Sequence, residues 1–158
     1  MQSRPVNGIS LIVGYSYNQT AYTRSNIYEN GSRLRYNPSH TANASLYYSF
    51  GNVFANSTLR GLNAGVTAYY VGDRLAGRNT RTLNPATGLP WPTADAFKLI
   101  ALPNYVLFDA SLGYAYERFS VRVKLANLLN ELSYNVHDDN SINPIAPRNF
   151  AATITYKL

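Results

Sequence analysis

The sequence predicts an all-β fold, an antiparallel up-and-down meander of about six strands. Three observations support this prediction. Apolar and polar residues alternate with a period of two along six segments, and no segment has the period of an amphipathic helix. Charged residues make up only 14% of the 158 residues, and much of the polarity comes from 14 Tyr and 18 Asn. Such a composition argues against a disordered chain, which is usually charged and poor in aromatic residues.

Each predicted strand has one apolar and one polar side. The predicted strands are 8–17, 41–50, 62–73, 105–116, 119–125 and 149–158. In the first and fifth strands the apolar side falls on the odd-numbered positions, and in the other four it falls on the even-numbered ones. The opposite sides are rich in Ser, Thr, Asn and Gly, which suits a wet interior better than a dry core.

The connections between the strands alternate between long and shorter ones. The segments 21–40, 74–104 and 129–148 are long, 51–61 is of medium length, and Glu117–Arg118 is a tight turn. This alternation is typical of an up-and-down membrane barrel with short turns on the periplasmic side. A connection of about 30 residues, such as 74–104, argues against a compact soluble domain.

Aromatic residues gather on the apolar side near the tight turn. They predict a membrane girdle formed by Tyr48, Phe50, Tyr114, Tyr116, Phe119 and Tyr156. Aromatic rings are expected where a barrel meets the lipid headgroups. Ordinary aromatic pairing across the strands of a soluble sheet is the alternative interpretation.

Three charged residues fall on the polar side of the fourth and fifth strands. Asp109, Arg122 and Lys124 are predicted lumen charges that form an ion-pair network. Antiparallel pairing around the turn at 117–118 places Asp109 roughly opposite Ala126, so that Lys124 is the nearer partner on the diagonal. We expect charge compensation within the wall here rather than direct contact with a ligand.

One long connection carries a basic cluster with an aromatic residue. Arg74, Arg78, Arg81 and Trp91 are the candidate ligand-binding residues, in a predicted extracellular loop. Arginine supplies a planar fork of donors, and tryptophan supplies a stacking face, which together suit an anionic ligand. Contact with anionic lipopolysaccharide, or simple solvation, would explain the cluster equally well.

No segment of the sequence carries a catalytic or metal-binding motif. There is no Cys, no Ser-His-Asp order and no phosphate-binding glycine loop, so we expect neither an enzyme nor a bound cofactor or metal. The segment His137-Asp138-Asp139 is interpreted as a solvated loop tip. The net charge of +6 is scattered along the chain, which argues against a nucleic-acid partner.

Three segments carry a resemblance to a known family. They are L-P-N-Y-V-L-F-D-A-S-L-G-Y (102–114), V-K-L-A-N-L-L-N-E-L-S-Y (123–134) and N-P-I-A-P-R-N-F (143–150), followed by a final alternating strand. In this order they resemble the C-terminal end of a TonB-dependent outer-membrane receptor, nearest to the siderophore receptors. The chain ends in Leu158, where the family often has Phe or Trp.

The resemblance implies a fold and a function. Residues 1–158 would be the C-terminal part of the receptor β-barrel, an arc of a transmembrane barrel of about 22 strands, with the plug domain and earlier strands absent. The expected location is the outer membrane of a Gram-negative bacterium, in contact with lipid and lipopolysaccharide. In the full-length protein the partners would be the plug domain and TonB, and the transported ligand a ferric siderophore. The chain alone is expected to transport nothing.

Two alternatives remain open from the sequence. A small, complete outer-membrane β-barrel with a structural or adhesion role could be built from 158 residues. A soluble β-sandwich that binds carbohydrate on Tyr and Trp loops is the other.

Overall fold

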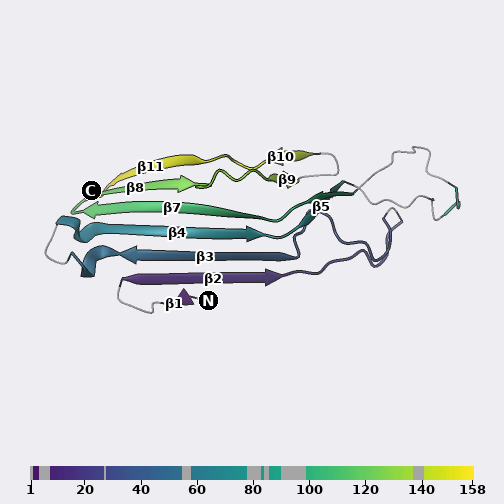
Figure 1. Ribbon diagram of the computed structural model, residues 1–158, viewed down its shortest axis with the longest axis horizontal. Helices are drawn as coiled ribbons and strands as arrows, with labels where there is room; N and C mark the ends of the chain where they lie inside the picture. Colours follow the sequence, from purple (N-terminus) through teal and green to yellow (C-terminus); the bar gives the residue numbers. More distant parts are fainter. Residues whose placement is uncertain are drawn as a thin grey trace.

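The computed structural model describes residues 2–3, 8–26, 28–54, 58–77, 83, 86–89, 99–136 and 141–158. Most of these form one antiparallel sheet of seven strands in the order β1-β2-β3-β4-β7-β8-β11 (Figure 1). The bounds are β1 Gln2–Ser3, β2 Ile9–Tyr17, β3 His40–Ser49, β4 Leu62–Val71, β7 Tyr105–Tyr116, β8 Phe119–Ala126 and β11 Asn149–Tyr156. The predicted meander of six strands is confirmed, and β1 is added at one edge.

Two small hairpins lie inside connections that the sequence predicted as long loops. β5 (Arg74–Gly77) pairs with β6 (Leu99–Leu102), and β9 (Tyr134–Val136) pairs with β10 (Ile142–Pro144). Strands of three or four residues are too short to show a clear alternation, which is why the sequence pattern misses them. Both hairpins lie at one end of the sheet (Figure 1).

The opposite end of the sheet carries the shorter connections. The turn at 117–118 joins β7 to β8, and two 3-10 helices, η1 (Phe50–Asn52) and η2 (Thr58–Gly61), lie between β3 and β4. Phe50 therefore belongs to η1 and not to the strand in which it was expected. No helix in the described part of the chain is long and apolar enough to cross a membrane.

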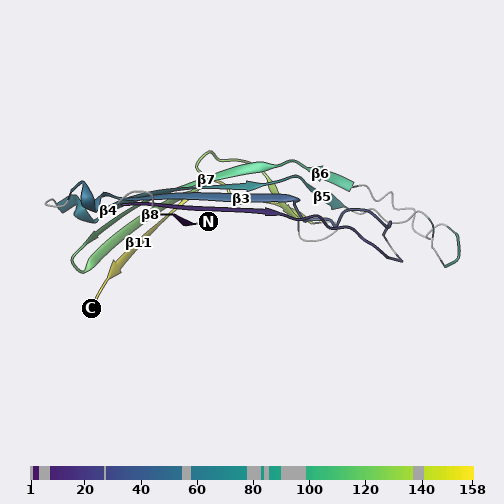
Figure 2. The ribbon, with the colours of Figure 1, turned by 90° about the horizontal axis from the view of Figure 1, so that it is seen from below.

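The sheet is a single twisted layer (Figure 2). The buried hydrophobic residues among the described ones are Ala76, Leu102 and Ile145, all of them outside the seven-stranded sheet. Large apolar side chains on the sheet itself are exposed, Leu112 by 53% and Ile154 by 74%. The described part of the chain therefore leaves the apolar side of the sheet exposed.

Strand register separates the side chains into two faces. Residues directly opposite one another in neighbouring strands point to the same face. Leu46 pairs with Val66, and Leu112 pairs with Val123, on what we call the apolar face, which comprises the odd positions of β2 and β8 and the even positions of β3, β4, β7 and β11. The alternate positions form the polar face, where the Ser45 and Thr67 hydroxyls lie 3.0 Å apart.

Candidate functional site: the polar face and the end with the long connections

The polar face carries an ion pair between β7 and β8. Lys124 Nζ lies 2.8 Å from Asp109 Oδ2, with side-chain exposures of 51% and 14% respectively. Ala110 pairs with Leu125, so the next pair along would set Asp109 opposite Ala126 and place Lys124 on the diagonal. This is the contact that the register around the tight turn predicted.

The second oxygen of the Asp109 carboxylate holds the chain where β8 ends. The Asn127 backbone N–H donates to Asp109 Oδ1 at 3.0 Å. Asn127 is buried and has φ 50°, a left-handed conformation that Asn adopts more readily than most residues. Its side chain donates to the carbonyls of Glu131 and Ala146 and accepts from the Glu131 N–H. This role of Asn127 was not predicted from the sequence. The feature that could have indicated it is an Asn directly after an alternating strand.

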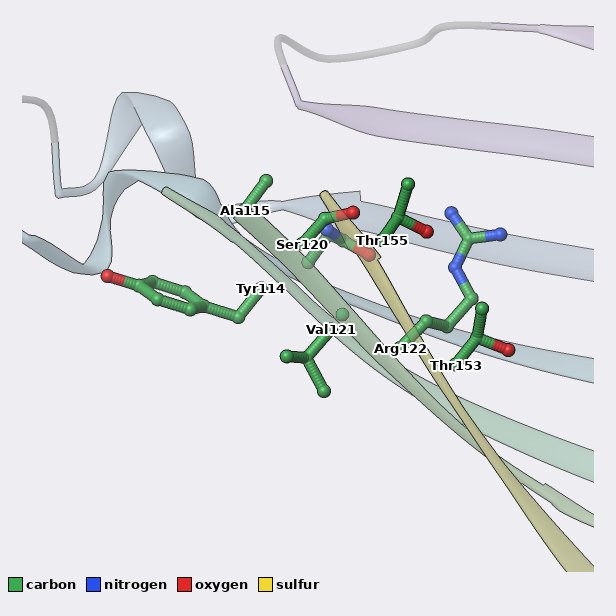
Figure 3. Close-up of a pocket in the computed structure, with 9 residues that line it drawn as sticks. Tyr114, Ala115, Ser120, Val121, Arg122, Thr153 and Thr155 are labelled. Atoms are coloured by element: carbon green, nitrogen blue, oxygen red, sulfur yellow. The ribbon is translucent and has the colours of Figure 1, made fainter. Parts of the chain in front are cut away.

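Arg122 occupies the polar face of β8 at a position nearer the tight turn than Lys124. It pairs with Gly113, which in turn pairs with Asn63. A Cβ at Gly113 would lie 2.5 Å from Asn63 Oδ1, so glycine leaves room for that amide. Figure 3 shows Arg122, Thr153 and Thr155 on one side of the strands, with Tyr114 and Val121 on the other.

Two shallow cavities adjoin the Arg122 side chain. One of about 300 Å³ is bordered by Ser120, Thr153 and Thr155, and the other, of about 400 Å³, extends toward Asp109 and Lys124. Tyr47 and Tyr69 also line the larger cavity. The polar face thus offers phenols, hydroxyls and an amide around two cations and one carboxylate, a surface that suits a polar ligand or domain with acidic groups.

Arg74 is placed differently from the sequence expectation. It was expected in an extracellular loop, but it begins β5 and is only 6% exposed. Its guanidinium donates to the carbonyls of Gly72 and Tyr134 at 3.2 and 3.0 Å and lies over the Tyr105 ring at 4.9 Å. Packing across two connections gives Arg74 a structural role, and its predicted contact with a ligand stays a prediction. Arg78, Arg81 and Trp91 lie outside the described residues, as does 137–139.

Arg35 joins the first long connection to β5. Its guanidinium donates to the Gly77 carbonyl and to the Tyr28 hydroxyl, each at 2.7 Å, and it lies 4.5 Å from the centre of the Tyr28 ring. The Tyr36 N–H donates to the Leu75 carbonyl beside it. Arg35 and Arg74 together hold the β5–β6 hairpin between two other connections. The role of Arg35 was not predicted from the sequence, because the segment around it shows no strand or helix periodicity from which its position could be inferred.

Five of the six aromatic residues of the predicted girdle share the apolar face, and the sixth, Phe50, lies in η1 with its ring against Tyr48. Phe119 pairs with both Tyr116 and Tyr156, and Tyr114 lies one apolar-face position further from the turn on β7. Tyr48 pairs with Ala64, which pairs with Leu112, and Leu112 lies one further apolar-face position along β7. The row therefore steps along the strands in one direction, as expected for strands tilted against a common plane. Contact of this row with a membrane remains a prediction.

Comparisons with known proteins give a family and a set of similar folds. The family model described as TonB dependent receptor-like, beta-barrel matches residues 4–128. No curated protein matches the sequence. Among solved structures, the pyoverdine outer membrane receptor FpvA from Pseudomonas aeruginosa bound to pyoverdine aligns with a TM-score of 0.71 and 17% identity, covering 99% of this chain and 20% of that one.

Two further solved structures have the same fold over nearly the whole chain. The ferric-catecholate import receptor Fiu from E. coli K12 gives a TM-score of 0.69 at 21% identity, covering 98% of this chain and 19% of its own. The siderophore receptor PirA from Acinetobacter baumannii gives 0.68 at 19% identity, covering 96% and 20%. The chain thus spans about one fifth of the length of these receptors.

Proposed function

This chain belongs to the TonB-dependent receptor-like β-barrel family, and we propose that it forms part of the wall of an outer-membrane receptor for ferric siderophores. The observation that carries the proposal is the single sheet with one exposed apolar face and one polar face. A wall between lipid and a wet interior needs this division of side chains. A soluble sandwich would need a second sheet over the apolar face, and the described residues form only one layer across it.

In this proposal the apolar face contacts lipid in the outer membrane of a Gram-negative bacterium. The end with the β5–β6 and β9–β10 hairpins faces outward, and the turn at 117–118 faces the periplasm, because long connections lie outside in such barrels. The aromatic row near the turn then meets the lipid headgroups. The outer end is in contact with lipopolysaccharide.

The polar face would line the interior and contact the plug domain of the full-length receptor, which couples to TonB. Arg122 and Lys124 against Asp109 leave one excess positive charge on the described polar positions of β7 and β8. Arg78, Arg81 and Trp91 remain candidates for contact with an anionic ferric siderophore at the outer end. Arg35 and Arg74 would support that end by fixing the β5–β6 hairpin, whose connecting segment contains these three candidates in the sequence.

Uptake measurements test the proposal in the full-length receptor that carries this segment. Cells without their own siderophore receptors would express it and be supplied with ferric siderophores of the pyoverdine and catecholate classes, labelled with radioactive iron. We expect uptake of at least one class that disappears when TonB is deleted. Uptake of neither class, from a receptor that folds in the membrane, would contradict the siderophore assignment.

A pair of variants separates ligand contact from wall structure. Arg81→Gln removes one candidate donor, and Arg24→Gln removes an exposed arginine in the first long connection. A role for Arg81 in binding predicts a weaker apparent affinity for the ferric siderophore in the first variant only. Equal affinities of the two variants for the ferric siderophore would indicate that Arg81 is solvated and does not contact the ligand.

A further inference from the structure

The connection between β3 and β4 folds toward the apolar face of the sheet. In η1, the Phe50 ring packs edge-on against Tyr48 with centroids 4.6 Å apart, and Phe54 stacks on Phe50 at 5.9 Å. Further along, the Thr58 carbonyl accepts a hydrogen bond of 2.7 Å from the Tyr114 hydroxyl. Tyr48 and Tyr114 both belong to the apolar face. Both halves of the connection are therefore tied to side chains on that side.

A close backbone approach fixes this connection in place. Gly61 ends η2 beside β7, and a Cβ at this position would lie 1.7 Å from the Ala115 carbonyl oxygen. Only glycine allows the two backbones to approach so closely. The 3-10 helices are thus held against the end of the sheet by Gly61, by the Tyr114 hydrogen bond and by the ring cluster.

The same connection presents apolar side chains outward. Val53 is 60% exposed and Leu59 is 44% exposed, and the exposed Arg60 follows directly. A connection that meets only water gains nothing from exposing Val and Leu beside a cluster of three aromatic rings. Together with Tyr48 and Tyr114, these residues extend the apolar face beyond the end of the strands.

The described charged residues at this end of the sheet are mostly positive. Among them Arg60, Arg118 and Lys157 stand against Glu117, and the Lys157 N–H donates to the Arg118 carbonyl, so these two residues are neighbours. Basic side chains close to an aromatic interface attract lipid phosphates, while their stems cover apolar surface.

We propose that the described parts of the β3–β4 connection, 50–54 and 58–61, form an interfacial anchor that lies in the phospholipid headgroup layer, at the end of the sheet that carries the turn at 117–118. Val53 and Leu59 contact the upper acyl chains, and Arg60 contacts the phosphate of an anionic phospholipid. We assign lipid as the binding partner for two reasons. The connection is continuous with the apolar face, and the described basic residues at this end of the sheet attract lipid phosphates. This inference rests on the proposed function, in which that face is in the membrane.

Spin labels at single cysteines test the anchor. The segment contains no Cys, so labels can be placed one at a time in the full-length receptor, cleared of any other cysteine and reconstituted in vesicles of phosphatidylglycerol and phosphatidylcholine. Val53→Cys and Leu59→Cys report on the connection. Leu46→Cys, at the middle of the apolar face, is the lipid control, and Arg24→Cys is the water control. Relaxation by oxygen and by an aqueous nickel chelate gives the relative depth of each label.

We expect Val53 and Leu59 labels to lie between the two controls, with an oxygen-to-nickel accessibility ratio several-fold above that of Arg24. Ratios equal to that of Arg24 would overturn the anchor. Labels shielded from both reagents would also overturn it, because they would indicate a protein partner instead of lipid. If the Leu46 label is itself accessible to water, the apolar face is not in the membrane and the proposed function is wrong. A lipid-accessible Leu46 label with water-accessible Val53 and Leu59 labels would overturn the anchor alone.

A lipid exchange tests the role of Arg60. In vesicles of phosphatidylcholine alone, the Val53 label is expected to shift toward the aqueous control, and Arg60→Gln is expected to abolish the difference between the two lipid compositions. The matched control Arg24→Gln should leave that difference intact. A Val53 depth that is independent of lipid charge in the unsubstituted receptor would overturn the phosphate contact.

Discussion

The Asp109 carboxylate binds the Lys124 ammonium at 2.8 Å across the β7–β8 pair. Its other oxygen accepts the Asn127 N–H at 3.0 Å, so one side chain both pairs a charge and fixes the point where β8 ends. The two interactions differ in environment. Lys124 is half exposed, whereas Asn127 is buried.

This difference predicts unequal effects of removing either partner of the ion pair. Asp109→Ala leaves a buried N–H unsatisfied and should lower the free energy of unfolding by about 1–3 kcal/mol. Lys124→Gln should cost no more than about 1 kcal/mol, because exposed pairs contribute little. Urea midpoints of the full-length receptor, followed by the mobility of folded and unfolded barrel on gels, measure both. Ser111→Ala, on the same face of β7, is the control, and equal losses for the two charge variants would contradict the argument.

Asn127→Asp should loosen the third long connection. The substitution keeps the acceptor for the Glu131 N–H but removes the donor to the Glu131 and Ala146 carbonyls, and it places a carboxylate beside them. The local cost is expected to be about 1–3 kcal/mol, seen as faster hydrogen exchange at the Glu131 amide.

Asn130→Asp is the matched control for that substitution. Asn130 also has a positive φ of 56°, but its described side-chain bond uses only the oxygen, which accepts the Arg148 N–H, and Asp retains that acceptor. Exchange at the Glu131 amide should stay close to that of the unsubstituted receptor. Similar acceleration in both variants would show that backbone conformation, and not the amide donor, sets the stability here.

Arg35→Lys should free the first long connection from β5 although the charge is kept. A lysine lacks the planar fork that reaches the Gly77 carbonyl and the Tyr28 hydroxyl together. We expect exchange of the Tyr36 amide, which donates to Leu75, to accelerate by about tenfold or more. Arg24→Lys, at an exposed position of the same connection, should leave that amide unchanged. No acceleration in Arg35→Lys would show that charge alone holds the connection.

Gly61→Ala is expected to impair folding more than Gly113→Ala. At Gly61 the added methyl meets the rigid Ala115 backbone, whereas at Gly113 it meets the end of the Asn63 side chain, which can rotate away. Overpacking of this kind costs about 1–3 kcal/mol where the neighbour cannot move. The folded fraction after refolding into vesicles compares the two variants, and a larger loss for Gly113→Ala would contradict the placement of η2.

Much of the sheet could be predicted from the sequence because the alternation of side chains is a local property. Each strand turns successive residues to opposite faces whatever its neighbours are, so the two faces and the aromatic row on one of them follow from position alone. The tight turn at 117–118 also fixes the pairing of β7 with β8, and with it the contact of Asp109 and Lys124. The TonB-dependent receptor family was recognisable from the order of three segments.

Only the tertiary structure decided what the long connections do. Arg35 reaches Gly77 across 42 positions and Arg74 reaches Tyr134 across 60, and no local pattern encodes such partners. For this reason the sequence placed Arg74 in a loop, and only the structure shows that it begins β5 and is buried. The packing of η2, 58–61, against the sheet likewise depends on Tyr114 and Ala115, which are distant in sequence. The sequence by itself determined the strands and their faces, because period and turn length are local. The packing of the connections was decided in three dimensions, because it depends on contacts between segments with no common period.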